Sequence, residues 1–135
     1  MALMRNGTVT NWGNTFGAIP SNLTNAIAIA AGTNFCLALR SNGTVVAWGG
    51  NGSGTNVPAG LTNVVAIAAG DFHAIALKVD GTVTNWGLNT SFQTNAPSGL
   101  SNVMAVAAGR AHSVALKNDG TVVGWGDNSL DQTNV

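Results

Sequence analysis

The sequence has little charge for its 135 residues. Only 7% of the residues are charged, against roughly a quarter in average soluble proteins. Lys and Arg together number five, and so do Asp and Glu. Such a balanced chain has no long-range field that would attract nucleic acid, an anionic membrane or an acidic substrate. We therefore expect no nucleic-acid partner.

Cysteine and long apolar runs are also scarce. The single cysteine, Cys36, excludes an internal disulfide framework and a zinc site built from cysteines within one chain. No segment approaches the roughly 18 apolar residues of a membrane span, since the run from Ala26 to Ala31 ends at Gly32. We expect a chain without membrane insertion, in which Cys36 is a small buried residue.

The chain does contain an internal repeat. An Asn-Gly-Thr-Val or Asp-Gly-Thr-Val turn is followed four times by Trp-Gly, with the tryptophans at Trp12, Trp48, Trp86 and Trp125. A second block, Ala-Ile-Ala-Ala-Gly or a near copy, ends at Gly32, Gly70 and Gly109. Both blocks follow one period, so residues 1–135 are interpreted as a single domain. Its copies are approximately 1–32, 33–70, 71–109 and 110–135.

Each copy is predicted to form β-strands, because β-branched and aromatic residues alternate and no apolar pattern of helical spacing persists. Two-residue Asn-Gly or Asp-Gly turns are the strongest short signal for a β-hairpin. The glycine of such a turn accepts a positive φ without steric cost. The four turn glycines are Gly7, Gly43, Gly81 and Gly120.

Four antiparallel strands are expected in a complete copy. The first is Ala26–Ala31 or its equivalents Val64–Ala69 and Val103–Ala108, where alanine alternates with larger residues. The second and third strands flank the hairpin turn. The fourth is a short extended piece ending at a proline, at 18–20, 56–58 and 95–97. A four-stranded sheet repeated at this spacing predicts tandem β-propeller blades, with a solenoid as the competing geometry.

The pattern His-x-x-Ala-Leu-Lys-x-Asp-Gly-Thr-Val-x-x-Trp-Gly occurs at His73 to Gly87 and again at His112 to Gly126. It resembles the regulator of chromosome condensation (RCC1-like) repeat family, and the resemblance covers nearly the whole chain. The resemblance implies a β-propeller, commonly of seven blades. Four hairpin blocks but three Ala-Ala-Gly blocks predict about 3.5 to 4 blades here. Residues 1–4 would be the second strand of a first blade and residues 132–135 the fourth strand of a last one.

An open arc of blades would leave sheet faces exposed at both ends, and proteins normally cover such faces. We therefore expect self-association. Two or more chains would complete a ring, or would add head to tail into a filament if the rotation does not close. The alternative interpretation is that the sequence is a fragment of a longer chain.

Most repeated side chains are interpreted as structural. His73 and His112 share a slot that holds Phe35 in another copy, and no third ligand has recognisable spacing, so we expect structural histidines and no metal. The tryptophans are expected to pack between blades; a stacking platform for sugars or bases is the alternative.

Acidic and basic residues of the repeats also have structural explanations. Asp80 and Asp119 are expected to form turns, because Asn occupies the same slot in the other copies. Asp127 and Asp131 are candidates for a polar contact or a cation, although calcium would need more oxygen ligands. The cations at one slot before the turn are expected to protect sheet edges; they are Arg40, Lys78 and Lys117.

Residues that differ among the copies are the better candidates for binding. The loops that follow Ala-Ala-Gly and those that follow Trp-Gly both vary. Aromatic and arginine side chains supply most interface hot spots. The candidates on these loops are Phe16, Asp71, Phe72, Phe92, Arg110 and Leu130. The alternative is that the aromatic residues fill gaps between blades.

The sequence thus predicts a non-catalytic module for protein–protein interaction or self-assembly, with itself and another protein as partners. No catalytic residue or cofactor is expected. The resemblance implies two alternatives: an inhibitor-like protein that binds an enzyme through one loop face, and an exchange factor for the nuclear GTPase Ran. The short, nearly uncharged chain disfavours exchange. Its wealth of Asn, Thr and Gly favours an extracellular location.

Overall fold

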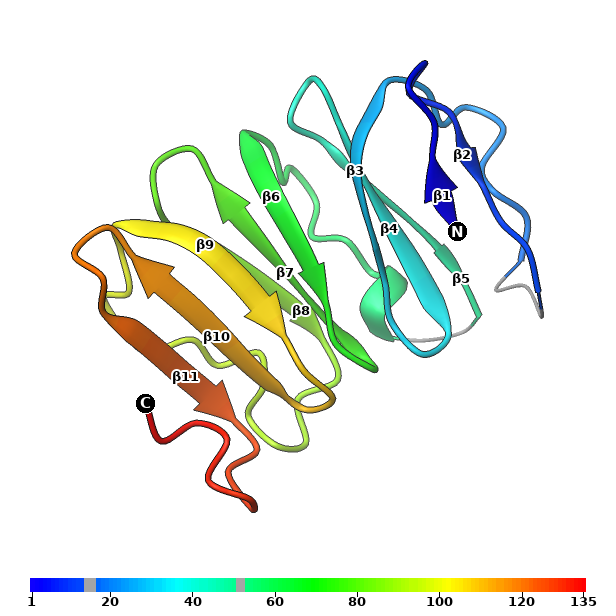
Figure 1. Cartoon of the computed structure of the whole chain (residues 1–135). Helices are drawn as coiled ribbons and strands as arrows, with labels where there is room; N and C mark the ends of the chain where they lie inside the picture. The colour runs from blue at the N-terminus through cyan, green and yellow to red at the C-terminus, as the bar shows by residue number, and fades with distance from the viewer. Residues whose placement is uncertain (14–16, 51–52) are drawn as a thin grey trace.

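The computed structural model describes residues 1–13, 17–50 and 53–135. In these ranges four small antiparallel sheets lie side by side in chain order (Figure 1). The two chain ends lie at opposite ends of the array. The all-β prediction is confirmed, and the one helical element of the described residues is a single 3-10 turn, η1 (Ser53–Thr55).

Three of the sheets have three strands, with the second strand of each copy in the middle. We call these sheets blades 1, 2 and 3, and the two-stranded sheet the half-blade. The half-blade pairs β1 (Ala2–Leu3) with β2 (Val9–Thr10). Blade 1 contains β3 (Ala26–Ala31), β4 (Phe35–Arg40) and β5 (Val45–Gly49). Blade 2 contains β6 (Val64–Ala69), β7 (His73–Lys78) and β8 (Val83–Gly87). Blade 3 contains β9 (Val103–Ala108), β10 (His112–Lys117) and β11 (Val122–Gly126).

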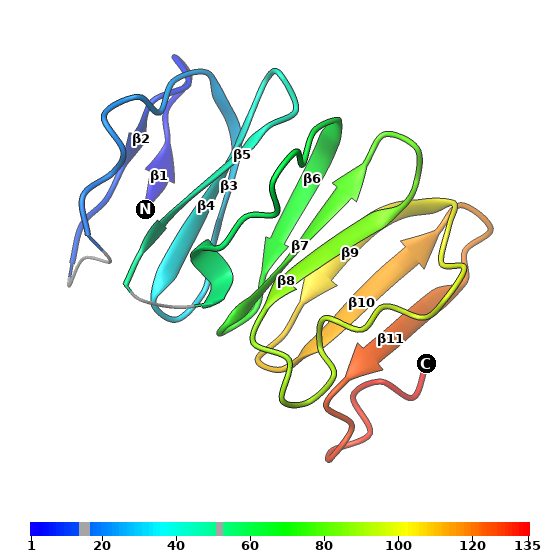
Figure 2. The same cartoon turned by 180° about the vertical axis from the view of Figure 1, so that it is seen from behind.

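The predicted fourth strands are wrong. No ladder joins the third strands to the segments expected there, which are 18–20, 56–58, 95–97 and 132–135. A proline such as Pro58 has no N–H to donate to a ladder. Side chains hold two of these connections: Asn89 Oδ1 accepts a hydrogen bond from Thr94 N–H at 3.0 Å, and Asn128 Oδ1 accepts one from Thr133 N–H at 3.0 Å. Figure 2 shows the connection from β8 to β9 as an irregular loop.

The four predicted hairpin turns are present. In the turn between β4 and β5, Asn42 Oδ1 accepts hydrogen bonds from Thr44 N–H (3.1 Å) and Thr44 Oγ1 (2.7 Å). Asp80 Oδ1 accepts the same two bonds from Thr82, at 3.0 and 2.6 Å. Gly43 follows Asn42 with φ at 75°, a conformation that glycine adopts freely. The Asn-or-Asp, Gly, Thr order therefore closes each turn on itself.

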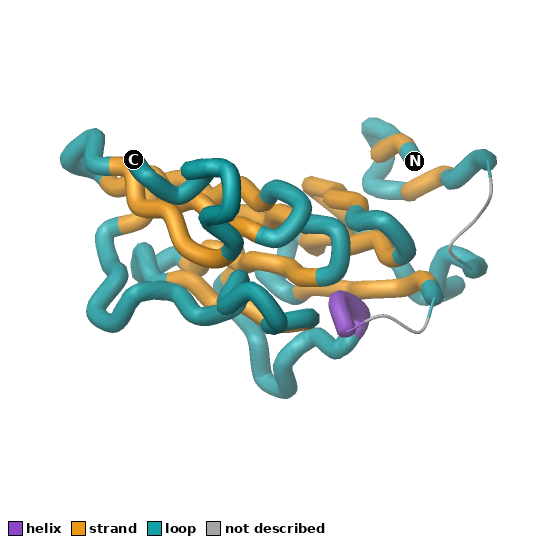
Figure 3. The backbone as a smooth tube through the Cα atoms, turned by 90° about the horizontal axis from the view of Figure 1, so that it is seen from below, coloured by secondary structure: helices purple, strands orange, loops and turns teal. Residues whose placement is uncertain are grey.

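The hydrophobic core lies between blades. Leu37 and Leu39 of blade 1 pack with Ala74, Ala76 and Trp86 of blade 2 in one buried cluster. Corresponding clusters join the half-blade to blade 1 and blade 2 to blade 3. Viewed from below, strands occupy the middle of the molecule and loops surround them (Figure 3). Each blade thus buries its apolar side chains against its neighbours.

Backbone hydrogen bonds also cross from blade to blade. The carbonyl oxygens of three hairpin glycines accept a bond from the N–H of the first residue in the next blade. These bonds are Ala26 to Gly7 (3.0 Å), Val64 to Gly43 (3.1 Å) and Val103 to Gly81 (3.1 Å). A second series at the opposite end joins Thr33 N–H to the Asp71 carbonyl (3.0 Å) and Asp71 N–H to the Arg110 carbonyl (3.2 Å). The blades are therefore linked at both ends.

The four tryptophans are not equivalent. Trp86 is 6% exposed and its Nε1–H donates to the Gly54 carbonyl at 2.8 Å, while Trp125 Nε1–H donates to the Gln93 carbonyl at 3.0 Å. Trp12 is 67% exposed. The accepting carbonyls lie 32 positions earlier in the chain. Trp12 is thus exposed among the described residues, and its expected packing role stays a prediction.

We expect Trp86→Ala to lower the free energy of unfolding by about 3–5 kcal/mol, because it opens a cavity between blades 1 and 2. At a concentration where the chain is monomeric, the matched variant Trp12→Ala should change it by no more than about 0.5 kcal/mol, as for other exposed positions. Urea denaturation followed by circular dichroism measures both. Equal losses in the two variants would contradict the assignment of the core to the surfaces between blades.

Candidate functional site

A polar junction joins blades 2 and 3. His73 is completely buried, and its Nε2 lies 2.9 Å from Ser113 Oγ of the next blade. Ser113 Oγ donates its single hydrogen to the Gln93 carbonyl at 2.9 Å. His73 Nε2 must therefore carry the proton that it shares with Ser113. The same Gln93 carbonyl accepts a hydrogen bond from Trp125. One backbone oxygen therefore joins the connection between β8 and β9 to both β10 and β11.

The environment of His73 keeps its imidazole neutral. Burial lowers the pKa of His73, the nearby His112 lowers it further, and Asp71 opposes this with a smaller effect. A buried neutral imidazole that is bonded to serine resembles the arrangement of a nucleophile and its base. Here, however, no part of either side chain is exposed to a substrate. The geometry therefore fits a structural hydrogen bond.

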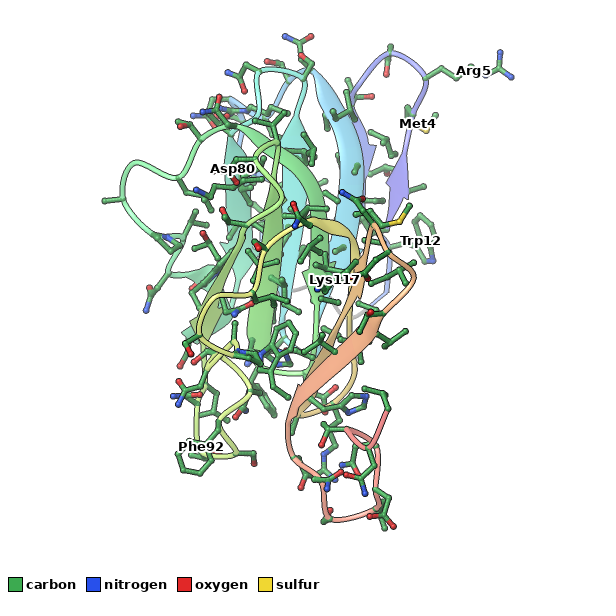
Figure 4. All side chains as sticks on the ribbon, turned by 90° about the vertical axis from the view of Figure 1, so that its left-hand side faces the viewer. Met4, Arg5, Trp12, Asp80, Phe92 and Lys117 are labelled. Carbon is green, nitrogen blue, oxygen red and sulfur yellow. The ribbon has the colours of Figure 1, made fainter. Side chains whose placement is uncertain are left out.

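The candidate binding residues lie on loops at one end of the blades. Leu88 N–H, which follows β8, donates to the Phe72 carbonyl at 2.9 Å, so the two variable loop sets adjoin. We call this end the loop face. Figure 4 places Phe92 on it, at the end of the molecule opposite to the hairpin-turn residue Asp80. Of the six candidates, Phe16 lies outside the described residues, and the binding role of the others stays a prediction.

Two loops of the loop face have the same internal support. Phe92 is 67% exposed, and beside it Ser91 N–H donates to Gln93 Oε1 at 2.8 Å. The exposed Leu130 donates its own N–H to Gln132 Oε1 at 2.7 Å. Because glutamine side chains hold both loops, these apolar residues are presented on shaped loops with little conformational freedom to lose on binding.

Asp71 and Arg110 form the charged part of the loop face. Arg110 Nε lies 3.8 Å from Asp71 Oδ2, and the Arg110 side chain is exposed. An exposed pair at this distance adds little stability, so the guanidinium remains accessible to a partner. Within the described residues, His, Cys, Asp and Glu nowhere gather in a group of three or more that could hold a metal ion.

The remaining aspartates are occupied by local bonds. Asp127 Oδ2 accepts hydrogen bonds from Ser129 Oγ (3.2 Å) and Gln132 Nε2 (2.9 Å). Asp131 Oδ1 accepts one from Asn134 Nδ2 at 2.9 Å. The two carboxylates therefore shape the last loop. Their use as a cation site, weighed from the sequence, finds no support in this geometry.

Sequence analysis missed Gln93 and Ser113. A signal for Gln93 exists, because Gln-Thr-Asn recurs at Gln132 in the next copy. Ser113 occupies a slot that holds Cys36 and Ala74 in the other copies, so it looked like an arbitrary small residue. Its role depends on His73, which is 40 positions away in the sequence.

The two ends of the blade array differ from its interior. A Cβ at Gly43 or Gly81 would meet the backbone of the next blade, whereas one at Gly120 would meet nothing within 4 Å. On the same end face Val122 is 40% exposed, although its counterpart Val83 packs between blades 2 and 3. We call this surface of blade 3 the C-terminal end face.

Comparison with known proteins identifies the family of the repeat. The family model of the Regulator of chromosome condensation (RCC1) repeat matches residues 26–55, 64–93 and 104–132, together more than half of the chain. Each match begins in a first strand or directly at it, and ends in the connection after Trp-Gly. No curated protein sequence matches the chain significantly.

Solved structures share the fold. Yeast RCC1 (Prp20), solved in complex with Kap60, is 27% identical with a TM-score of 0.66, covering 79% of this chain and 33% of that protein. Prp20p of Saccharomyces cerevisiae, studied for its binding to Gsp1p and histones, is 28% identical with a TM-score of 0.64. The match covers 78% of this chain and 34% of Prp20p. The CRINKLY WD40 ectodomain of the Arabidopsis thaliana receptor kinase ACR4 is 25% identical with a TM-score of 0.72. The match covers 90% of this chain and 43% of that ectodomain.

This chain thus spans between a third and less than half of the length of these relatives. The likeness confirms the prediction of tandem β-propeller blades. None of the described helical structure has the length and apolar character that crossing a membrane requires.

We expect Ser113→Ala to lower the free energy of unfolding by about 1–3 kcal/mol, because the buried imidazole of His73 would lose its partner. Alanine fits the slot, since Ala74 occupies it in blade 2. Urea denaturation measures the change, with the exposed Ser101→Ala as control. Equal stability of the two variants would refute the importance of the junction.

A second prediction concerns pH. Hydrogen bonds from Thr82, with a smaller contribution from Lys78, lower the pKa of Asp80 from 3.8 to about 2. Because the pKa of Asp80 is lower in the folded state, its carboxylate stabilises the fold at pH values above 3.8. This stabilisation is lost as the pH falls toward about 2. A carbon-detected NMR titration should find the Asp80 midpoint near 2.

Asp80→Asn is the matched variant, because Asn42 makes the same turn bonds in blade 1. This variant should fold normally. Its free energy of unfolding should depend less on pH between about 2 and 3.8 than that of the original chain. An Asp80 midpoint at the ordinary value would contradict the strength of the Thr82 bonds.

Proposed function

Because the chain belongs to the regulator of chromosome condensation (RCC1) repeat family and has its propeller fold, we propose that it is a non-catalytic protein-interaction module. It assembles with copies of itself through the two ends of its blade array. A ring forms if the rotation between copies closes, and a filament forms if it does not.

The observation that carries this proposal is the C-terminal end face. In the interior, Leu39 and Leu77 on the second strands are buried by the following blade, with exposures of 0% and 3%. Their counterpart Leu116 is only half-buried. Val122 lies beside it, together with the uncovered Gly120. A surface built like the interior of the blade array favours a partner that is built like a blade.

Opposite ends of the array are suited to each other. At the N-terminal end, the exposed Trp12 carries the packing surface that Trp86 and Trp125 bury against the preceding connection. At the other end, the connection after Trp125 is the counterpart of those connections. Because the two surfaces differ, the contact between copies is heterologous, running head to tail.

The solved relatives support protein binding in general. Yeast RCC1 was solved with Kap60 bound, and Prp20p was studied for binding to Gsp1p and histones. Those partners belong to proteins of which this chain covers about a third. Exchange activity is therefore not proposed here.

The loop face supports a second candidate function, namely binding of a different protein in the manner of an inhibitor. Its support is the pair of shaped loops that present Phe92 and Leu130, with Arg110 exposed on the same face. Large aromatic and arginine side chains are typical interface anchors. This binding would leave both ends of the array free for assembly.

We expect the mass of the purified chain, measured by light scattering, to rise with concentration. Val122→Asp should hold the chain at monomer mass, because a carboxylate would be buried in the apolar contact. The matched control is Val79→Asp, at an apolar residue that is 71% exposed on blade 2 and away from both ends.

A wild-type chain that remains monomeric at every concentration would refute self-assembly and leave the loop face as the binding surface. Growth without limit would indicate a filament, while a single larger mass would indicate a ring. Assembly that Val79→Asp abolishes and Val122→Asp does not would place the contact elsewhere.

A further inference from the structure

The imidazole at the junction between blades 2 and 3 lies in surroundings that fit only its neutral form. His73 is completely buried, and its Nε2–H donates to Ser113 Oγ at 2.9 Å. The other ring nitrogen, Nδ1, is also buried and has no hydrogen-bond partner among the described residues. A proton added to the neutral ring goes to Nδ1, because Nε2 already carries one. Protonation would therefore place a charge and an unpaired N–H in the interior, and both are costly there.

The strands around His73 supply no counter-charge. Its neighbours β6, β8 and β9, the turn η1 and the connection 88–102 contain no ionisable side chain. The lysines of β7 and β10 lie at the hairpin end of their strands, where they pair with Asp80 and Asp119 at 3.3 Å. Among the described residues, no carboxylate is hydrogen-bonded to the imidazole.

The loop end of the junction carries the remaining titratable groups. Burial lowers the pKa of His73 below its ordinary 6.5; His112, which begins β10, lowers this pKa further, and Asp71 raises it by less. Asp71 itself lies 3.8 Å from Nε of Arg110. The Asp127 carboxylate accepts hydrogen bonds within its own loop. These groups together leave a charge on His73 without compensation.

The junction between blades 1 and 2 shows that packing does not require a histidine in this slot. Phe35 fills the slot there and is completely buried. Trp86 donates to the Gly54 carbonyl at 2.8 Å, as Trp125 donates to the Gln93 carbonyl at 3.0 Å. Two junctions of the same design therefore differ in one respect, since only the second has a buried group that can take up a proton.

We propose that His73, Ser113 and Gln93 form an acid-sensitive latch between blades 2 and 3. The latch is closed while the imidazole is neutral, and uptake of a proton from solvent at Nδ1 drives the ring out of the interior and opens it. The Gln93 carbonyl accepts from both Ser113 and Trp125. Opening therefore also frees the connection that presents Phe92 on the loop face, while the junction between blades 1 and 2 stays closed.

Proton uptake favours the open state. In that state the imidazole has its ordinary pKa of 6.5, and in the closed state it has a lower one. The closed state is therefore most stable above pH 6.5 and loses stability as the pH falls below this value. Each pH unit below 6.5 raises the opened fraction about tenfold, until the imidazole of the closed state itself becomes charged.

Two indole protons report the opening within one sample. Trp125 Nε1–H is bonded at the junction between blades 2 and 3, and Trp86 Nε1–H at the junction between blades 1 and 2. NMR hydrogen exchange measures both rates, and their ratio cancels the intrinsic dependence of exchange on pH. We expect the Trp125 rate relative to the Trp86 rate to rise about tenfold between about pH 7.5 and about pH 5.5.

His73→Gln and His112→Gln form the matched pair of variants. Glutamine keeps an N–H donor near the position of Nε2, so it can still bond to Ser113, but it does not titrate in this pH range. The relative rate in His73→Gln should stay within about twofold across the interval. His112 occupies the same slot in blade 3 and is less buried than His73, so His112→Gln should retain most of the rise.

A constant relative rate in the unaltered chain, or an equal rise in His73→Gln, would overturn the latch. The imidazole resonances of the unaltered chain decide the matter if His73→Gln does not fold. His73 should titrate below 6.5, and its charging should coincide with loss of protection at the Trp125 indole. A His73 that becomes charged while Trp125 stays protected would contradict the proposal.

Discussion

The close approach of neighbouring first strands is the constraint on which the rest of the structure depends. A Cβ added at Gly32 would clash with the Gly70 carbonyl of the next blade, and one at Gly70 would clash with the Gly109 carbonyl. Backbones can come this near only where a side chain is missing. The alanines of the first strands follow from the same requirement, because larger residues would separate the blades.

Once the spacing of the blades is set, the other contacts follow. Tryptophans fill the wider space at the third strands, and the hairpin glycine carbonyls reach the next backbone. No blade has an apolar core of its own, so stability is shared between neighbours, as in other repeat proteins. A blade at either end of the described array packs against one neighbour instead of two. The proposed assembly removes that deficit without any specialised binding residue.

Local patterns predicted the strands and turns because their causes are local. The first strand at 26–31 and the turn around Gly43 depend on residues that are adjacent in the sequence. The expected fourth strand is missing from the described sheets; Asn89 instead bonds within the connection, and its proline has no N–H for a ladder. Loop residues on the variable face could be listed from the sequence, although their support by Gln93 and Gln132 could not.

Long-range features were beyond such patterns. The bond between His73 and Ser113 joins two copies, and neither residue is informative alone. Trp12 carries the same motif as Trp86, yet it is 67% exposed and Trp86 only 6%. A repeated sequence thus predicts the strands and turns of each copy, while the position of the copy in the array determines which contacts its side chains make.

The junction of His73, Ser113 and Gln93 also bears on how such an array can change through recombination. Exchange between near-identical repeats adds or removes a whole copy, and interior contacts made by shared residues survive that event. Loss of residues 71–109 would place Phe35 next to Ser113 and remove Gln93 altogether. The second and third blades are therefore a matched pair, and the order of copies carries structural information that their consensus does not.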